Sequence, residues 1–290
     1  CKGRTCPPAS FMFFEGSTYR QYIDIALKVL DLKHQNATLP FLIGVNKSTK
    51  VPKIGNLTEI RHLLVTGSQG GGKTRMITSL AISMKYFSTP GLINLSMLDF
   101  KGALQILQPL GEYHKELKEI KEKLKKAIKL RAQIQGSIDK ENCEDLLALN
   151  KKRIKKRLKP IAYNILLIDE YAALASEDKE ISPLVEHLAA VGRSAGFLII
   201  ISTQRADHIA ISSRIKANVL SNLSFAQRDK INAGVAGVQG SEALSKPGEF
   251  IFYSKLESTH LHSPYFSLDQ ARKFAENLEA SPLHIFFRKK

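Results

Sequence analysis

The chain has 290 residues, of which 43% are hydrophobic, and it carries a formal net charge of +16. This length and apolar content suffice for one large α/β domain with a small additional element, and they exclude disorder as the overall state. The charge indicates a polyanionic partner, either nucleic acid or an anionic membrane face. The three cysteines, at positions 1, 6 and 143, match neither a disulfide framework nor the paired spacing of a zinc site.

The apolar runs of the sequence are short. Runs such as residues 197–201 have the length of a buried strand and fall far below the roughly 20 residues that cross a bilayer. The cysteine pattern fits a reducing, cytoplasmic setting. Because the chain begins with Cys1 rather than Met, an anchor encoded upstream would place it at the cytoplasmic face of a membrane.

Residues 1–60 are predicted to form an N-terminal appendage. Residues 18–32 have the apolar spacing of an amphipathic helix, and residues 41–45 and 51–54 have the pattern of a β-hairpin closed by residues 46–50. We expect this appendage to lie against the domain that follows.

Short apolar strands alternate with helical stretches from residue 61 onward, which is typical of an open, mostly parallel sheet flanked by helices. The predicted fold class is therefore α/β, with a main domain over residues 61–265, a helical insertion over 112–160, and a C-terminal helix and tail over 266–290. The expected core strands are residues 62–66, 92–98, 164–168, 197–202 and 220–225, and two expected helices are residues 74–86 and 181–191.

Residues 67–74 read Gly-Ser-Gln-Gly-Gly-Gly-Lys-Thr and lie between a predicted strand and a predicted helix. The glycines let the backbone curl so that its N–H groups point at phosphate oxygens, and the helix turns its positive N-terminus toward the anion. Lys73 is placed to reach the β- and γ-phosphates of ATP, and the Thr74 hydroxyl to ligate Mg²⁺. The predicted ATP-binding residues are Gly67, Ser68, Gln69, Gly70, Gly71, Gly72, Lys73, Thr74 and Arg75.

Two carboxylates, Asp169 and Glu170, follow the apolar strand predicted over residues 164–168. This strand brings Asp169 to the carboxyl end of the sheet, beside the phosphate-binding loop, where it can hold the water shell of Mg²⁺. Glu170 then fits as the residue that orients or deprotonates the attacking water. A chain with both carboxylates is expected to hydrolyse ATP, and Glu170 and Lys73 are its principal catalytic candidates.

Two further catalytic candidates follow in the chain. Gln204, at the end of the strand predicted over residues 197–202, is a polar side chain that can sense the γ-phosphate. Arg193 can act in trans as an arginine finger if the protein forms rings, because developing phosphoryl charge needs a cation. The alternatives remain open that these residues are a solvated turn and an ordinary surface arginine.

Residues 115–159 carry sixteen lysines and arginines against seven aspartates and glutamates, and therefore more than half of the net charge. Residues 115–131 have the spacing of a helix with one apolar stripe. A second basic run, residues 151–159, favours a surface that faces a polyanion over a merely solvated lysine-rich face. The DNA-binding candidates are Lys151, Lys152, Arg153, Lys155, Lys156 and Arg157.

The ordered motifs resemble those of the FtsK/SpoIIIE-type DNA translocases and the related coupling ATPases of conjugative elements. The resemblance covers about residues 40–265. Its landmarks are residues 42–44, 50–52 and 56–57, the strand and loop over 61–74, the Asp-Phe-Lys-Gly turn at 99–102, the acidic strand and its continuation at 167–174, and the segments 192–197, 202–205, 215–218 and 247–250.

This resemblance implies a RecA-like motor, usually a hexameric ring, that hydrolyses ATP to move double-stranded DNA through its centre. It also implies that ATP lies between subunits, so that a neighbouring arginine completes the site, and that a membrane or conjugation-pore partner is reached through an N-terminal segment. We expect no counterpart of the family's C-terminal winged helix within residues 266–290, because this segment is too short for it. The basic segment 115–159 is also unusual for the family.

Three functions are compatible with these features. A DNA-translocating ATPase of conjugative transfer or chromosome segregation is the leading hypothesis. An ATPase that drives protein secretion shares the same core, but a pore for peptides has no general need of the basic surplus. A scaffold that binds ATP without hydrolysing it is disfavoured, because Lys73 and Glu170 are both present.

Overall fold

The computed structural model describes residues 39–204, 207, 210–255, 257–264 and 267–280. The helix predicted over residues 18–32, the two N-terminal cysteines and Arg205 lie outside these residues. Within the described ranges, no helix is both long enough and apolar enough to cross a bilayer.

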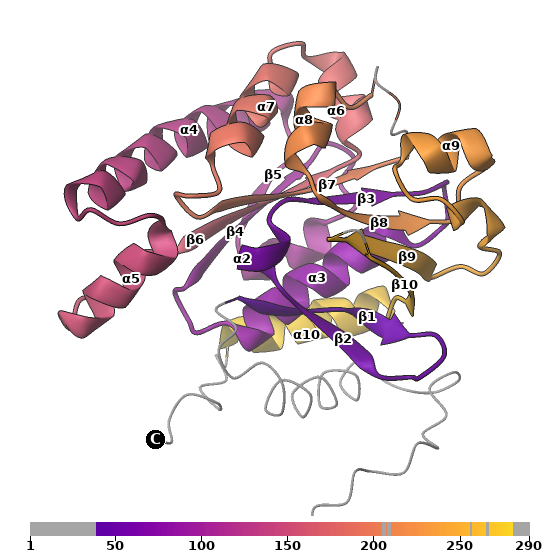
Figure 1. Cartoon of the computed structure of the whole chain (residues 1–290), viewed down its shortest axis with the longest axis horizontal. Coiled ribbons are helices and arrows are strands. Elements are labelled where there is room, and N and C mark those ends of the chain that lie inside the picture. Colours follow the sequence, from indigo (N-terminus) through magenta and orange to yellow (C-terminus); the bar gives the residue numbers. More distant parts are fainter. Residues whose placement is uncertain (1–38, 205–206, 208–209, 256, 265–266, 281–290) are drawn as a thin grey trace, which may run out of the picture.

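A ten-stranded sheet runs through the described part of the chain (Figure 1), in the order β2-β1-β10-β9-β8-β3-β7-β6-β4-β5. The strands from β8 to β5 are parallel, whereas β9, β10, β1 and β2 pair antiparallel on the other side. The strands are β1 Pro40–Asn46, β2 Pro52–Asn56, β3 Leu63–Thr66, β4 Ile93–Asp99, β5 Glu112–His114, β6 Tyr163–Asp169, β7 Phe197–Thr203, β8 Ser221–Phe225, β9 Glu249–Ser254 and β10 Glu257–His262.

Helices cover both faces of the sheet (Figure 1). α3 and α10 lie together on one face, with α3 against β1, and α4, α6, α7 and α8 lie on the other. The helices are α2 Leu57–Ile60, α3 Lys73–Phe87, α4 Leu117–Lys140, α5 Leu146–Lys155, α6 Tyr171–Glu177, α7 Ile181–Val191, α8 Ser213–Asn218, α9 Lys230–Val235 and α10 Leu268–Ala280, with 3₁₀ helices η1 Gln105–Leu110 and η2 Ser241–Ala243.

The predicted α/β class is confirmed, and the five predicted core strands are present as β3, β4, β6, β7 and β8. β3, β6 and β7 are buried along their whole length, since helices cover both faces of the parallel part. Three strands run one residue further than predicted, to Asp99, Asp169 and Thr203. Polar residues therefore belong to the strand ends themselves, where their backbone is paired within the sheet.

The helix predicted over residues 115–131 is longer than its pattern indicates. α4 runs from Leu117 to Lys140, because Ile134 and Ile138 continue the buried stripe that begins with Ile120 and Leu124. Together with the buried Ala127, these residues follow one another at spacings of four, three, seven and four, which keep their side chains on one face of a helix. The polar residues between them obscure the stripe in the sequence.

The predicted hairpin forms as β1 and β2, and it extends the central sheet itself. β1 pairs with β10 through Val45 and His262, and the backbone N–H of Leu42 donates a 3.2 Å hydrogen bond to Ser83 Oγ on α3. Residues 40–56 thus share one hydrophobic core with the parallel strands.

Candidate nucleotide-binding site

The loop between β3 and α3 consists of residues 67–72. Gly72 precedes the helix with φ of 112°, and Gly67 has φ of 147°. A Cβ atom on Gly67 would lie 2.6 Å from Cβ of Phe225. Both positions therefore favour glycine through their backbone conformation, and Gly67 also requires it because β8 packs against the loop.

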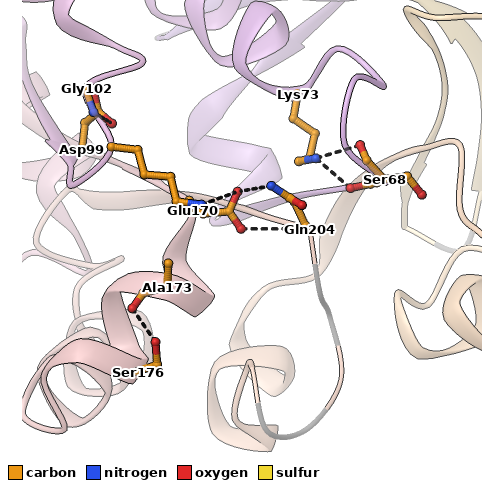
Figure 2. A network of polar contacts seen from close by, with 10 residues as sticks. Ser68, Lys73, Asp99, Gly102, Glu170, Ala173, Ser176 and Gln204 are labelled. Atoms are coloured by element: carbon orange, nitrogen blue, oxygen red, sulfur yellow. Dashed lines mark hydrogen bonds and ion pairs between the residues drawn. The ribbon is translucent and has the colours of Figure 1, made fainter.

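Lys73 begins α3, and its side chain is buried. Its ammonium group donates hydrogen bonds of 2.7 Å to the Gly67 carbonyl and 3.0 Å to the Ser68 carbonyl (Figure 2). Burial lowers the pKa of Lys73, and the nearby charges of Glu170 and Asp169 act in the opposite direction. The lysine is thus held inside the loop, close to the acidic pair.

The remaining predicted ATP-binding residues lie around this lysine. Gln69 and Gly70 form the exposed tip of the loop, and Thr74 and Arg75 lie in the first turn of α3. The positive end of a fifteen-residue helix therefore faces the loop. This is the arrangement that binds phosphate in P-loop proteins.

Residues far along the chain brace the loop. The backbone N–H of Ser68 donates a 2.9 Å hydrogen bond to the Ala226 carbonyl, and the N–H of Gly248 donates one of 3.1 Å to the Gly71 carbonyl. Phe225 packs against the same backbone. The shape of the loop thus depends on β8 and on the entry to β9.

Asp169 ends β6 and is almost fully buried. Burial raises its pKa, and the charges of Asp99 and Glu170 add to this effect. Asp99 occupies the paired position on β4. The Ser202 hydroxyl beside Asp169 offsets part of the rise, but within the described residues Ser202 Oγ has no partner in hydrogen-bonding geometry.

Glu170 follows directly and adopts a left-handed conformation, with φ of 49° and ψ of 50°. Gln204 Nε2 donates a 2.8 Å hydrogen bond to Glu170 Oε2, and Figure 2 shows the two side chains pointing toward one another. Lys101 Nζ lies 4.0 Å from the same oxygen. Few non-glycine residues adopt this backbone conformation, and those that do cluster at functional sites.

Asp99 builds the turn that follows β4. Its carboxylate accepts hydrogen bonds from the backbone N–H groups of Gly102 at 2.9 Å and Leu104 at 2.6 Å, and from the Tyr113 hydroxyl at 3.2 Å. Burial and the Asp99 charge raise the pKa of Tyr113 to about 12. The carboxylate of Asp99 is therefore occupied by the protein itself.

Arg193 is not brought to this site within one chain. It lies exposed in the connection from α7 to β7, at the amino end of the parallel strands, whereas the loop and the acidic pair lie at the carboxyl end. Partial burial lowers its pKa, and the neighbouring Arg61 charge lowers it further, against the effect of Asp145. Two arginines therefore gather at the opposite edge of the sheet.

The basic run also lies at the amino edge, on α5 and directly after it. α5 and α6 lie at opposite ends of β6 (Figure 1). The buried Asn150 of α5 donates a 2.8 Å hydrogen bond to the Ile161 carbonyl and accepts one of 2.7 Å from its N–H. This side chain fastens the helix to the segment that leads into β6.

The basic helices α4 and α5 differ in where their lysines form ion pairs. On α4, Lys121 pairs with Asp178 at 2.8 Å, and Lys123 with Glu112 at 2.7 Å. Near α5, Lys156 pairs with Glu141 at 3.0 Å. Ile154 and Leu158 of the same run are 60% and 50% exposed. Of the described parts of the insertion, the region from α5 to residue 159 combines the densest positive charge with exposed apolar side chains.

A model of the FtsK/SpoIIIE family matches residues 27–212, which is more than half of the chain. The chain belongs to the FtsK/SpoIIIE family. The resemblance indicated by the ordered motifs is thereby confirmed.

Two relatives in the FtsK/SpoIIIE family are named DNA translocase FtsK. The protein of Rickettsia typhi is 26% identical over 297 aligned positions, which cover 88% of this chain and 40% of that protein. The protein of Agrobacterium fabrum is 27% identical over 299 positions, which cover 88% of this chain and 33% of that protein. The chain therefore spans well under half the length of these relatives.

Two solved structures with the same fold are a conjugation coupling protein and a secretion ATPase. The conjugation coupling protein TcpA of pCW3, in a monomer form with ATPγS, has a TM-score of 0.73 and 19% identity over 85% of this chain and 72% of that chain. The cytoplasmic domain of the Type VII secretion ATPase EccC of Thermomonospora curvata has a TM-score of 0.73 and 18% identity over 83% and 31%. At these identities the likeness establishes the P-loop ATPase fold.

Two features of this FtsK/SpoIIIE site do not follow from the sequence motifs. The first is the bracing of the loop by Phe225 and Gly248, although residues 247–250 are among the landmarks of the resemblance. The second is the structural role of Asp99, whose hydrogen bonds hold the turn from which Lys101 extends toward Glu170. The Asp-Phe-Lys-Gly landmark pointed to this turn without indicating its use.

Proposed function

We propose that this chain is the motor core of an ATP-hydrolysing DNA translocase. The observation that carries the proposal is the group of side chains at the carboxyl edge of the parallel strands: Lys73 inside the phosphate-binding loop, the buried Asp169, and Glu170 hydrogen-bonded to Gln204. This group has the parts that phosphoryl transfer to water requires. The relatives named DNA translocase support DNA as the substrate on which the motor acts.

ATP would bind over residues 67–75, with its phosphates on the backbone N–H groups of the loop and on Lys73. Thr74 and Asp169 would hold Mg²⁺. The donors fit this ion, because Asp169 is buried and the adjacent Ser202 hydroxyl lacks a partner among the described residues, so that a hydrated cation would satisfy both. When bound, Mg²⁺ neutralises charge on the β- and γ-phosphate oxygens.

Each side chain then has a role in hydrolysis. The phosphate oxygens replace the Gly67 and Ser68 carbonyls as acceptors for Lys73. The oxygen of the attacking water forms a bond to the γ-phosphorus, the bond to the β–γ bridging oxygen breaks, and Glu170 accepts the proton of the water. Gln204, at the end of the neighbouring strand, orients Glu170 and senses the γ-phosphate.

A ring of identical subunits, hexameric in the leading hypothesis, would complete the site. Arg193 lies at the edge of the sheet opposite the nucleotide loop of its own chain. Only a neighbour's nucleotide is therefore accessible to it without rearrangement of the fold. An arginine supplied in trans stabilises the charge of the transferring phosphoryl group.

DNA would be held by the basic run on and after α5. The candidates Lys151, Lys152, Lys155 and Arg157 are exposed, and phosphate contacts of this kind do not depend on base sequence. Double-stranded DNA is favoured, as the family resemblance implies. A membrane or conjugation-pore partner, as the family resemblance implies, completes the proposal.

Protein secretion is the second candidate function. The observation in its favour is the shared fold with EccC, and with EssC from Geobacillus thermodenitrificans at a TM-score of 0.74 and 18% identity. Against it stand the higher identities to DNA translocases and the net charge of +16. Binding of a secretion-signal peptide in preference to DNA would decide for secretion.

The test is steady-state ATP hydrolysis at low salt, with and without double- and single-stranded DNA, for the full chain and for Glu170→Gln. We expect hydrolysis that DNA stimulates and salt weakens. Glu170→Gln should abolish turnover while ATP binding survives. Hydrolysis that is unchanged by either DNA would refute translocation, and an unaltered rate in Glu170→Gln would remove Glu170 from its role.

A further inference from the structure

The turn after β4 is held in one conformation by hydrogen bonds to Asp99. The carboxylate of Asp99 is fully buried and accepts from two backbone N–H groups and the Tyr113 hydroxyl. Gly102 has φ of 85°, a left-handed conformation that glycine adopts without strain. A turn held by three hydrogen bonds to one buried carboxylate fixes the direction in which the residue at its centre leaves the backbone.

That central residue is Lys101. Its side chain is 52% exposed, and Nζ lies 4.0 Å from Glu170 Oε2, whose side chain is 13% exposed. Lys101 is also close enough to Lys73 to lower its pKa. The turn thus places a second lysine at the edge of the nucleotide site, on the candidate catalytic carboxylate.

The carboxylate of Glu170 is held from two elements at once. Gln204, directly after β7, donates its amide N–H to Oε2 at 2.8 Å, and Lys101, from the turn after β4, supplies the positive charge. β4 and β7 flank β6, so the two partners reach Glu170 from both neighbouring strands.

The balance of charge explains why a cation is needed there. Asp99, Asp169 and Glu170 lie at neighbouring strand ends, and Asp99 is the register partner of Asp169 across β4 and β6. A triphosphate entering the loop adds further negative charge. A carboxylate that must stay near this triphosphate is repelled by it, unless a cation on the far side of the carboxylate holds it in place.

We propose that Lys101 is a positioning residue for hydrolysis: it holds Glu170 against the repulsion of the triphosphate and, with Gln204, aims its carboxylate at the attacking water. This inference rests on the proposed ATPase function and adds a role that the P-loop and the acidic pair do not supply. Asp99 acts one step further back, because it fixes the turn from which Lys101 extends.

The experiment compares Lys101→Met, which keeps the length and removes the charge, with Lys101→Arg, which keeps a cation. Two readouts are taken on the full chain: kcat and KM for ATP hydrolysis with saturating double-stranded DNA at low salt, and the Kd of a fluorescent N-methylanthraniloyl ATP with Mg²⁺. The control is Lys118→Met, which removes an exposed lysine of α4.

We expect Lys101→Met to lower kcat by about 10- to 100-fold and to leave KM and the analogue Kd within about twofold, because misaligned catalytic groups affect turnover rather than binding. Lys101→Arg should recover most of kcat, and Lys118→Met should match the unchanged chain. Asp99→Asn should also lower kcat, and the double variant Asp99→Asn with Lys101→Met should be little worse than Lys101→Met alone, since both act through one contact.

Other outcomes overturn the proposal in distinguishable ways. A kcat of Lys101→Met equal to that of the unchanged chain, with Glu170→Gln inactive, removes Lys101 but leaves the ATPase function standing. A rise in the analogue Kd with kcat unchanged makes Lys101 a nucleotide contact. An unchanged chain that does not hydrolyse ATP overturns both the role of Lys101 and the proposed function.

Discussion

Gln204 Nε2 donates a 2.8 Å hydrogen bond to Glu170 Oε2, and it thereby joins the end of β7 to the residue that follows β6. The backbone N–H of Gln204 makes a longer contact of 3.5 Å with Oε1. Both carboxylate oxygens of Glu170, the candidate base, thus contact one residue, which directly follows the neighbouring strand. A movement at the end of β7 changes the direction of the carboxylate.

Substitution of Gln204 tests this coupling. Gln204→Leu keeps the backbone contact and removes the amide, so we expect kcat for ATP hydrolysis to fall by about 10- to 100-fold with ATP affinity preserved. Steady-state kinetics and nucleotide titration measure the two quantities separately. A variant with full kcat would show that Glu170 is oriented without Gln204.

Mixed rings test whether Arg193 acts in trans. Arg193→Ala and Glu170→Gln should each be inactive as pure proteins, since one lacks the cation and the other the base. Mixing the two creates interfaces that contain an intact Glu170 and a neighbour's intact Arg193, so hydrolysis should reappear above the level of either parent. A mixture no more active than its parents argues against a finger from the neighbouring subunit.

Charge reversal on α5 tests the DNA surface. We expect Lys151→Glu combined with Lys155→Glu to weaken double-stranded DNA binding by at least about tenfold, and to reduce the slope of log K against log salt by about 2 for two lost phosphate contacts. The matched control is Lys118→Glu with Lys126→Glu on α4, which changes the net charge equally. Equal losses in both pairs would assign DNA binding to overall charge rather than to α5.

Two glycine substitutions should have opposite effects on stability. Gly67→Ala places a Cβ atom 2.6 Å from Cβ of Phe225 at φ of 147°, so we expect a loss of about 1–3 kcal/mol in the free energy of unfolding. Gly136→Ala, inside α4 with nothing within 4 Å of the new atom, should gain about 0.5–1 kcal/mol. Urea unfolding followed by circular dichroism measures both, and a stabilised Gly67→Ala would contradict the close packing of the loop on β8.

His62 should make stability depend on pH. Its Nδ1 accepts a 3.0 Å hydrogen bond from the Ile199 N–H, and its Nε2 donates one of 3.0 Å to the Ala189 carbonyl. Burial lowers its pKa to about 4, and the Arg193 and Arg61 charges add to this effect, while the bond to Ala189 opposes it. The folded protein therefore favours the neutral ring, which leaves the histidine charged more readily in the unfolded chain.

The sign follows from these pKa values. The contribution of the neutral His62 ring to stability is fully present above pH 6.5, the ordinary pKa of histidine. As the pH falls to about 4, the free energy of unfolding should decrease by about 3 kcal/mol. Urea unfolding between pH 7 and 4 measures how steeply the free energy of unfolding changes with pH, and this slope should be smaller in His62→Gln. The control, His260→Gln, changes an exposed histidine. An unchanged slope in His62→Gln would exclude His62 as its source.

The nucleotide loop and the acidic pair can be predicted from the sequence, because their information is local. A strand, a glycine loop and a helix succeed one another within about twenty residues, and the strand before Asp169 is continuously apolar. The same holds for the parallel core, whose strands are short apolar runs, although β4, β6 and β7 each include one polar residue beyond the predicted run.

Contacts between distant segments cannot be read from such patterns. Thr66 Oγ1 donates a 3.2 Å hydrogen bond to Ser224 Oγ across 158 residues, and among the described strands it is β10 that joins the hairpin to the sheet. Asp99 has the same residue type and strand position as Asp169, yet three internal hydrogen bonds make it a structural residue. Only the folded backbone separates a carboxylate occupied by its own turn from one that is available to a cation.

Asn150 fastens α5 to Ile161 through a pair of hydrogen bonds, just before β6 begins. β6 then runs for seven residues, about 20 Å, and ends at Asp169 beside Glu170. β6 is paired with a strand on each side and hardly stretches, so tension applied to α5 would displace the candidate catalytic residues Asp169 and Glu170. Force on the basic run of α5 would then change the rate of ATP hydrolysis. Replacing Asn150 by a side chain that cannot form its two hydrogen bonds to Ile161 would weaken this coupling and leave both the basic run and the candidate catalytic residues unchanged.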